Sequence, residues 1–217
     1  MLSEETKLLK EILAKAKTPK IFILVGPSGV GKSTLCQLAT KKIKNLSYVV
    51  SATTRPKRPY EQDGKDYYFM SETDFLAYKA KGEFLETTRI YNSYYGILKS
   101  EIHKKLQSKK NLIMDVDIQG LINIKKHYPR NSVGIFILPP SIKELQQRYK
   151  MRARAEQEDP AVRLKALAAE LSWLKAELYK KNPKVDYILI NSKLNESVSK
   201  LVAIIKTEQV RITGGET

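Results

Sequence analysis

The chain has 217 residues, with 39 Lys and Arg against 23 Asp and Glu, which gives a formal net charge of +16 at pH 7. Its single cysteine excludes an intramolecular disulfide, and its two distant histidines exclude a Cys/His metal site. No apolar run approaches the length of a membrane-spanning helix and the N-terminus has no apolar signal core, so the sequence predicts a cytoplasmic protein without a membrane partner. The positive charge favours phosphate-bearing partners, either nucleotides or nucleic acid.

The hydrophobic pattern predicts strands that alternate with helices along most of the chain. In chain order, the pattern predicts a helix over 1–19, a strand over 21–25, a helix over 32–44, a strand over 46–50, a helix over 72–81, strands over 111–117 and 133–138 that are each followed by a helix, a helix over 160–181, a strand over 185–190 and a helix over 194–210. Such alternation predicts an α/β fold with a parallel sheet between helices. Residues 51–100 interrupt it with polar, aromatic and turn-rich sequence, and we interpret them as an insert.

The stretch GPSGVGKS (26–33) fits the phosphate-loop pattern G-x-x-x-x-G-K-[ST]. It follows a predicted strand and opens a predicted helix, where backbone N–H groups and the helix N-terminus attract phosphate. Lys32 is expected to contact the outer phosphates, and the Ser33 hydroxyl is expected to ligate magnesium. The alternative is a glycine turn without a ligand, which the strand and helix on either side disfavour. The motif therefore predicts binding of a nucleoside triphosphate.

A second strand ends in MDVDIQG (114–120), which offers two acids to the same site. An acid at the carboxyl end of a neighbouring strand holds the magnesium shell in other phosphate-loop enzymes. Only one of Asp115 and Asp117 is expected to face the metal. The alternative is that both acids merely end the strand.

Within the insert, cationic and aromatic side chains predict an anionic partner. Arg55 and Arg58 suit bidentate phosphate contacts, and Tyr67 adds a phenolic donor. Glu86 and Tyr95 fall in the same segment. A carboxylate there suits guanine, whose edge presents adjacent N1–H and N2–H donors, and disfavours adenine, which presents an acceptor at N1.

These pieces together resemble the guanylate kinases, P-loop nucleoside monophosphate kinases, from Ile21 to about Arg211. The matching motifs are GPSGVGKST, SATTRPKRP, DGKDYYF, GEFLE, YYG, MDVDIQG, ILPPS, the arginines from Arg148 to Arg163, and INS at 190–192. The resemblance implies a three-layer α/β/α P-loop NTPase fold with a mostly parallel sheet, an inserted GMP-binding subdomain and a helical lid. It implies magnesium-dependent, reversible transfer of the ATP γ-phosphoryl group to GMP or dGMP.

The resemblance also implies the site residues, by position in this chain. The phosphate of GMP would contact Arg55, Arg58, Tyr67 and Tyr95, and its guanine would contact Ser51, Glu86 and Asp117. The transferred phosphoryl group would be surrounded by Lys32, Arg148, Arg152 and Arg163. ATP would be bound by Gly26, Pro27, Ser28, Gly29, Val30, Gly31, Lys32, Ser33, Thr34 and, beside adenine, Asn191. Magnesium would be held by Ser33 and Asp115.

The implied segments are an N-terminal helical extension (1–19), core (20–50), the GMP-binding insert (51–100), core (101–147), the lid (148–163), and core with a C-terminal helix (164–217). The expected partners are ATP and GMP, without a specific nucleic acid, and the expected state is a monomer or homodimer.

Three positions depart from the family pattern. Tyr60 stands where glycine is usual, and a positive φ would strain a tyrosine there. Ala153 replaces the glycine that usually follows the second lid arginine. Ile97 replaces a serine or threonine whose hydroxyl contacts guanine, so GMP binding is expected to be weaker or base choice looser.

Three alternatives stay open at this point. Guanylate-kinase-like domains also serve as non-catalytic peptide-binding modules, but those typically lack an intact phosphate loop. The net charge is compatible with nucleic-acid binding, although the lysine pairs are scattered along the chain. A kinase for another nucleoside monophosphate is the nearest enzymatic alternative, because of Ile97.

Overall fold

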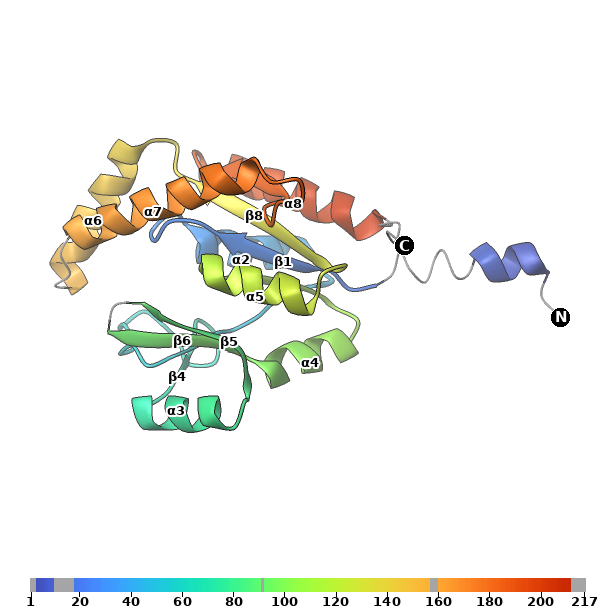
Figure 1. Cartoon of the computed structure of the whole chain (residues 1–217), viewed down its shortest axis with the longest axis horizontal. Coiled ribbons are helices and arrows are strands. Elements are labelled where there is room, and N and C mark those ends of the chain that lie inside the picture. Colours follow the sequence, from blue (N-terminus) through green and yellow to red (C-terminus); the bar gives the residue numbers. More distant parts are fainter. Residues whose placement is uncertain (1–2, 10–17, 91, 157–159, 212–217) are drawn as a thin grey trace.

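A five-stranded parallel sheet with the strand order β2-β7-β1-β8-β9 forms the centre of the computed structural model (Figure 1). The model describes residues 3–9, 18–90, 92–156 and 160–211, without the side chains of 150–156 and 160. The strands are β1 (Ile21–Val25), β2 (Leu46–Tyr48), β7 (Asn111–Asp115), β8 (Ser132–Leu138) and β9 (Tyr187–Ile190). All four pairings in this sheet are parallel, as the alternation of strands and helices predicts.

Helices cover both faces of the sheet (Figure 1). They are α2 (Lys32–Lys42), α4 (Lys99–Gln107), α5 (Ile118–His127), α6 (Ile142–Glu156), α7 (Pro160–Leu178) and α8 (Leu194–Val210). Phe22 and Leu24 of β1 pack with α2 and α8, whereas Ile21 and Ile23 pack with α4, α5 and α7. Because β1 is buried on both faces, its sequence is a continuous apolar run. The three-layer α/β/α fold is therefore confirmed.

Residues 52–98 contain a second sheet with the order β4-β3-β6-β5 and one helix. Its strands are β3 (Ala52–Thr53), β4 (Tyr68–Phe69), β5 (Phe84–Ile90) and β6 (Ser93–Leu98), and its helix is α3 (Glu72–Ala80). Phe75 of α3 stacks on Phe84 and Tyr94, with ring centroids 4.4 and 5.5 Å apart. This small aromatic core holds α3 on the sheet, below the central sheet in Figure 1.

Local side-chain chemistry sets several element ends. Ser71 accepts a hydrogen bond from the backbone N–H of Asp74 and so begins α3, as its position before the helical pattern predicts. Asp117 accepts one from the N–H of Gly120 at 2.7 Å and begins α5. The strand predicted over 111–117 therefore ends at Asp115, because Asp117 serves the next helix instead.

Four other predicted boundaries are wrong by two or three residues. The helix over 32–44 ends at Lys42, the strand over 46–50 ends at Tyr48, the helix over 160–181 ends at Leu178, and the strand over 185–190 begins at Tyr187. The helix predicted over 1–19 is seen at residues 4–9, and its part over 10–17 lies outside the described residues. In the part of the chain that the structure describes, no helix is both long and apolar enough to span a membrane.

The register of the central sheet brings distant residues to one edge. Leu24 pairs with Asp115 across β1 and β7, and Val25 pairs with Phe136 across β1 and β8. Leu138 at the end of β8 pairs with Ile190 at the end of β9. The carboxyl ends of these four strands therefore lie side by side, which is where open parallel sheets bind ligands.

Candidate functional site

The loop between β1 and α2 forms a tight, glycine-dependent turn. Gly26, Gly29 and Gly31 have φ of 133°, 74° and 99°, a region that glycine adopts without strain. At Gly26 a Cβ would lie 2.3 Å from the carbonyl oxygen of Ile137 on β8, so a side chain does not fit. The loop therefore closes against β8 and delivers its backbone to the first turn of α2, whose Gly31 N-cap makes no side-chain cap. The first-turn N–H groups of a helix attract anions.

Lys32 lies at the first position of α2 and folds over this loop. Its Nζ donates to the carbonyl oxygens of Gly26 at 2.6 Å and Pro27 at 3.1 Å. The ammonium is thereby held at the mouth of the loop, beside the N–H groups that attract phosphate. Ser28 and Thr34 are exposed at the same mouth, and Val30 is buried beneath it.

Asn191, predicted to lie beside adenine, is placed directly under the phosphate loop. It follows β9, is buried, and its Nδ2 donates to the carbonyl oxygen of Val30 at 2.7 Å. A Cβ on Gly31 would lie 2.6 Å from the same Nδ2. In this structure Asn191 therefore supports the shape of the loop, and Gly31 is needed for that close approach.

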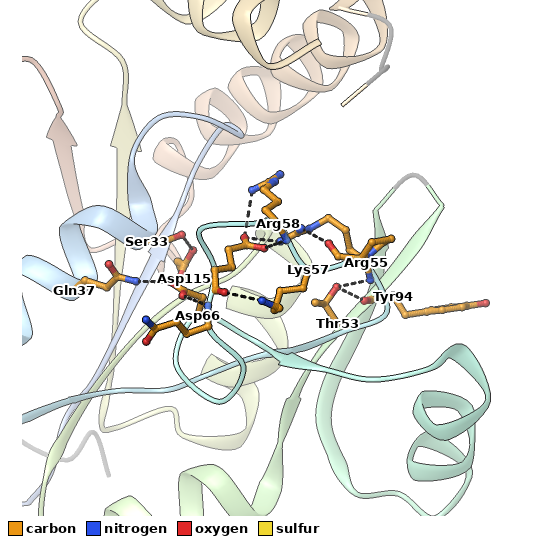
Figure 2. Close-up of polar contacts among 12 residues, drawn as sticks. Ser33, Gln37, Thr53, Arg55, Lys57, Arg58, Asp66, Tyr94 and Asp115 are labelled. Atoms are coloured by element: carbon orange, nitrogen blue, oxygen red, sulfur yellow. Dashed lines mark hydrogen bonds and ion pairs between the residues drawn. The ribbon is translucent and has the colours of Figure 1, made fainter. Parts of the chain in front are cut away.

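Ser33 and Asp115 meet at the carboxyl end of β7. The Ser33 hydroxyl donates to Asp115 Oδ2 at 2.6 Å (Figure 2). The Tyr48 hydroxyl donates to Asp115 Oδ1, also at 2.6 Å. A hydroxyl and a carboxylate beside a phosphate loop are the oxygen donors that Mg²⁺ prefers. The residues present therefore fit a magnesium site, and Tyr48, which the sequence did not single out, orients its carboxylate. Burial, together with the nearby charge of Asp115, raises the pKa of Tyr48 well above its ordinary value, so this phenol remains a donor.

Two of the three predicted lid arginines reach the phosphate loop. Arg148 Nη1 donates to the carbonyl oxygen of Gly29 at 3.2 Å, and Arg163 Nη1 donates to Ser28 Oγ at 3.4 Å. Arg163 is 3% exposed, with its guanidinium 5.6 Å from the ring centroid of Tyr149. Arg152 belongs to α6, and its side chain lies outside the described residues, as does that of Ala153. Two cations from α6 and α7 thus stand over the loop together with Lys32.

Glu170 is a carboxylate in this region that the sequence analysis missed. It lies on α7 seven residues after Arg163, and the helical repeat puts it on the same face as the buried Arg163, Leu167 and Leu174. Its Oε2 is buried without a hydrogen-bond partner among the described residues. Burial raises its pKa, the charge of Lys32 opposes that rise, and Asp117 adds to it. Glu170 therefore lies on the same face of α7 as Arg163, with one carboxylate oxygen buried.

The second sheet carries the predicted anion-binding arginines, which its loop holds close together. Arg55 Nη2 donates to Glu61 Oε1 at 2.7 Å, and Arg58 Nη1 lies 3.4 Å from the same oxygen. Figure 2 shows Arg55, Lys57 and Arg58 gathered on this loop. Tyr60, 75% exposed, does not have a positive φ, so the strain expected at that position does not arise.

Tyr67 and Tyr95 complete this cationic group. Their rings meet edge to face with centroids 6.0 Å apart, and the Arg55 guanidinium lies 5.5 Å from the Tyr67 ring centroid. Burial raises the pKa of Tyr67, so its hydroxyl remains protonated and able to donate. Two guanidinium groups and two phenols are a donor set suited to a phosphate.

Glu86 on β5 lies close enough to Asp117, at the start of α5, for the two carboxylates to interact, and the predicted guanine contact Ser51 is also buried. Glu86 is 7% exposed, and its Oε2 is buried without a hydrogen-bond partner among the described residues. Burial, and then the charge of Asp117, raise the pKa of Glu86 to about 8. Its cross-strand neighbour is Ile97, fully buried and without a hydroxyl. The Oε2 atom of Glu86 is thus available to a donor that the described residues do not supply.

One polar contact joins the two ends of the site. Gln37 on α2, one turn beyond Ser33, donates from Nε2 to Asp66 Oδ1 at 3.1 Å (Figure 2). Asp66 Oδ2 in turn accepts from the backbone N–H of Gln62 at 2.8 Å. The loop that carries the arginines is therefore tied to the helix that follows the phosphate loop.

Comparisons with known proteins agree over both ends of the site. The family model described as guanylate kinase matches residues 18–208. The guanylate kinase of Thermotoga maritima is 37% identical over 194 residues, 89% of this chain and 89% of that protein. The guanylate kinase of Bartonella henselae is 37% identical over 204 residues, 93% of this chain and 88% of that protein. The crystal structure of guanylate kinase from Anaplasma phagocytophilum superposes with a TM-score of 0.70 at 28% identity, covering 89% of this chain and 88% of that chain.

Proposed function

The chain belongs to the guanylate kinase family, and it transfers a phosphoryl group from ATP to GMP on a P-loop NTPase fold; we propose that the residues described above carry out this reaction with Mg²⁺. One observation supports the assignment of roles above all. The phosphate loop with Lys32 stands on the central sheet, the Arg55–Arg58 pair stands on the second sheet, and the Gln37–Asp66 contact joins them.

At the donor end, ATP phosphates lie on the loop formed by Gly26, Pro27, Ser28, Gly29, Val30 and Gly31 and on the first turn with Lys32, Ser33 and Thr34. The contacts of Lys32, Arg148 and Arg163 with this loop support their role beside the transferred phosphoryl group. Arg152 joins them from α6. Asn191 shapes the loop through Val30, and its proposed place beside adenine rests on the family pattern.

At the acceptor end, Arg55, Arg58, Tyr67 and Tyr95 hold the GMP phosphate. The base lies against Ser51, Glu86 and Asp117. The unpartnered Oε2 of Glu86 supports this, because guanine brings the adjacent N1–H and N2–H donors that this carboxyl lacks. Once ionised, Glu86 accepts both donors, and its burial makes an unmatched base costly.

The reaction needs no covalent intermediate. An oxygen of the GMP phosphate attacks the γ-phosphorus in line, the bond to the β,γ-bridging oxygen breaks, and ADP leaves with that oxygen. Arg55 and Arg58 aim the attacking phosphate, while Lys32, Arg148, Arg152 and Arg163 stabilise charge on the transferred group. Mg²⁺, held by Ser33 and Asp115, supplies further charge neutralisation when bound.

The segments have matching roles in this proposal. Residues 20–50, 101–147 and 164–217 form the core, 51–100 the GMP-binding insert, 148–163 the lid and 1–19 an N-terminal extension. The protein acts in the cytoplasm, as a monomer or homodimer. The intact phosphate loop supports an enzyme rather than a peptide-binding module.

The test is a coupled ADP-release assay with ATP and Mg²⁺ against GMP, dGMP, AMP, UMP and CMP. We expect strong preference for GMP over the bases that lack the N1–H and N2–H pair. Comparable rates with several bases would instead indicate that Ile97 loosens the choice of base. If correctly folded protein releases no ADP with any of these acceptors, the proposal is contradicted.

The raised pKa of Glu86 predicts that GMP binding depends on pH. Below pH 8 Glu86 is protonated in the free protein, and accepting two guanine donors requires its proton to leave. Stronger GMP binding is therefore expected as pH rises, with KM for GMP falling roughly eightfold from pH 7 to 8.5. The range from pH 7 to 8.5 lies above the second pKa of a phosphate group, about 6, so the charge of the GMP phosphate changes little within it. Initial rates at varied GMP and saturating ATP measure the effect.

Glu86→Gln is the control, because the glutamine side chain cannot titrate. Its KM for GMP is expected to be higher at every pH and to lose the pH dependence. Burial, together with the charge of Lys110, lowers the pKa of Lys105 to about 8, so this lysine titrates in the same window. A slope that survives in Glu86→Gln would contradict the role given to Glu86 and would point to another titrating group, such as Lys105.

A further inference from the structure

Glu61 is a buried carboxylate at the centre of the arginine loop, and nothing in the motif analysis gave it a role. Its side chain is 6% exposed. Oε1 accepts from Arg55 Nη2 at 2.7 Å and from Arg58 Nη1 at 3.4 Å, while Oε2 accepts from the backbone N–H of Arg58 at 2.8 Å. A single carboxylate thus contacts both arginines and the backbone between them.

The backbone of Glu61 closes the same loop. Its N–H donates to the carbonyl oxygen of Arg58 at 3.1 Å, and its carbonyl oxygen accepts from Lys57 Nζ at 3.1 Å. The cations Arg55, Lys57 and Arg58 do not by themselves fix such a loop, because like charges repel each other. Glu61 supplies a negative charge that both guanidinium groups contact, and its backbone carbonyl oxygen accepts from Lys57, in the region where Figure 2 gathers Arg55, Lys57 and Arg58.

The electrostatics of Glu61 favour its ionised form. Burial alone would raise the pKa of Glu61, but the hydrogen bonds from Arg55 and from the Arg58 amide, with the two guanidinium charges, bring that pKa below its ordinary value. Arg55 is also enclosed on its other side, with its guanidinium 5.5 Å from the Tyr67 ring centroid and 5.8 Å from that of Phe69. Its plane is therefore defined by a carboxylate and two rings.

We propose that Glu61 is a positioning residue for the acceptor phosphate: it holds Arg55 and Arg58 in the geometry in which they bind the phosphate of the nucleoside monophosphate. A guanidinium has five N–H donors, so a carboxylate that takes one of them fixes its plane and leaves the group able to bind a phosphate. Preorganised donors bind an anion more tightly than donors that must first be ordered. This inference rests on the proposed function, because that function makes the GMP phosphate the ligand of Arg55 and Arg58.

The negative charge of Glu61 also acts against phosphate binding. A carboxylate beside the site repels a phosphate and competes for the guanidinium groups. Glu61 is, however, outnumbered by the two arginines and Lys57 that it contacts, so the loop keeps a net positive charge. Losing the carboxylate removes the partner that Arg55 and Arg58 share, so the ligand must do more of the ordering of this pair when it binds, and we expect that loss to dominate.

The test compares GMP with guanosine, which has the same base and no phosphate. In Glu61→Gln, an amide donor faces the Arg55 and Arg58 donors, so at least one arginine contact is lost. Titration calorimetry with GMP should show a dissociation constant raised about ten- to hundredfold, whereas guanosine binding should be unchanged. KM for GMP should rise in parallel, with a smaller change in kcat and none in KM for ATP.

Glu177→Gln is a matched control. Glu177 is likewise a buried carboxylate that accepts from a nearby cation, Lys180 at 2.6 Å, and from a backbone N–H, that of Lys184 at 2.5 Å. Hydrogen bonds and charges likewise lower its pKa against the effect of burial. It lies at the end of α7, outside the proposed site. Its loss should lower the melting temperature by an amount comparable to that of Glu61→Gln, without changing binding of GMP or guanosine.

Each outcome decides between roles. If GMP and guanosine weaken together, Glu61 is only structural, and the inference is wrong. If GMP binds equally or more tightly in Glu61→Gln, the carboxylate merely competes with phosphate, which also overturns it. Should that variant not fold, Glu61→Asp, which keeps the charge but shortens its reach, is expected to show a weaker form of the same GMP-specific loss. If wild-type protein binds neither ligand, it is the proposed function that fails.

Discussion

Lys32→Ala is expected to lower kcat with ATP and GMP about a thousandfold, the scale of losing one preorganised charge at a phosphoryl-transfer site. The Lys32 ammonium is held at 2.6 Å from the carbonyl oxygen of Gly26, at the mouth of the phosphate loop. A charge fixed in that position costs no reorganisation as negative charge moves onto the leaving oxygen. The coupled ADP-release assay at saturating ATP and GMP measures the loss.

The fold should survive this change. Lys32 is the first residue of α2, and its side chain is partly exposed, so the variant keeps the core beneath it. Lys42→Ala, which removes an exposed lysine from the last turn of the same helix, should retain the wild-type rate. A folded Lys32→Ala protein within tenfold of the wild-type kcat would contradict the role given to this lysine.

The sequence predicts the donor end of the site well, because that end is built from local rules. Gly26, Gly29 and Gly31 occupy positive-φ positions that few other residues tolerate, and a buried strand and an amphipathic helix flank them. Asp115 ends a neighbouring apolar strand, so a parallel sheet brings it to the same edge. The glycine positions depend on residues close together in the chain, and the place of Asp115 follows from a local strand pattern together with the parallel order of the sheet.

The parts that escaped prediction depend on tertiary contacts. The pattern R-x-x-R-x-x-E contains Glu61, but nothing local indicates that this acid turns inward to both arginines. Glu170 is separated from Lys32 by most of the chain, and only its seven-residue spacing from Arg163 hints at a shared face. The family pattern places Asn191 beside adenine, yet its contact with Val30 was not foreseeable from either segment.

Strand ends illustrate the same limit at smaller scale. Asp117 continues an alternating strand pattern as written, and yet its carboxylate accepts the Gly120 N–H and begins α5. This resolves the choice that the sequence left open between the two acids: Asp115 faces Ser33, and Asp117 faces the Glu86 side. A competition between strand extension and helix capping decides it, and only the packed structure shows which one prevails.

Asp115→Asn is expected to lower kcat about a hundredfold and to raise the Mg²⁺ concentration needed for half-maximal rate. The carboxylate accepts from Ser33 at 2.6 Å and from Tyr48 at 2.6 Å, one bond on each oxygen. An asparagine side chain has one acceptor oxygen, so one hydroxyl would face an amide donor, and the negative charge that attracts the metal would be gone. Rates over a Mg²⁺ titration measure both effects.

Tyr48→Phe separates the charge of Asp115 from its orientation. It removes one hydrogen bond to the carboxylate and keeps the ionised group, so we expect less than about a tenfold loss in kcat and an unchanged Mg²⁺ midpoint. A readout without turnover is the rise in melting temperature that Mg²⁺ produces in the presence of ATP, which should shrink in Asp115→Asn and persist in Tyr48→Phe. If Asp115→Asn keeps both the Mg²⁺ midpoint and that rise, Asp115 only anchors Ser33 and Tyr48, and the metal must be held by other oxygens of the site.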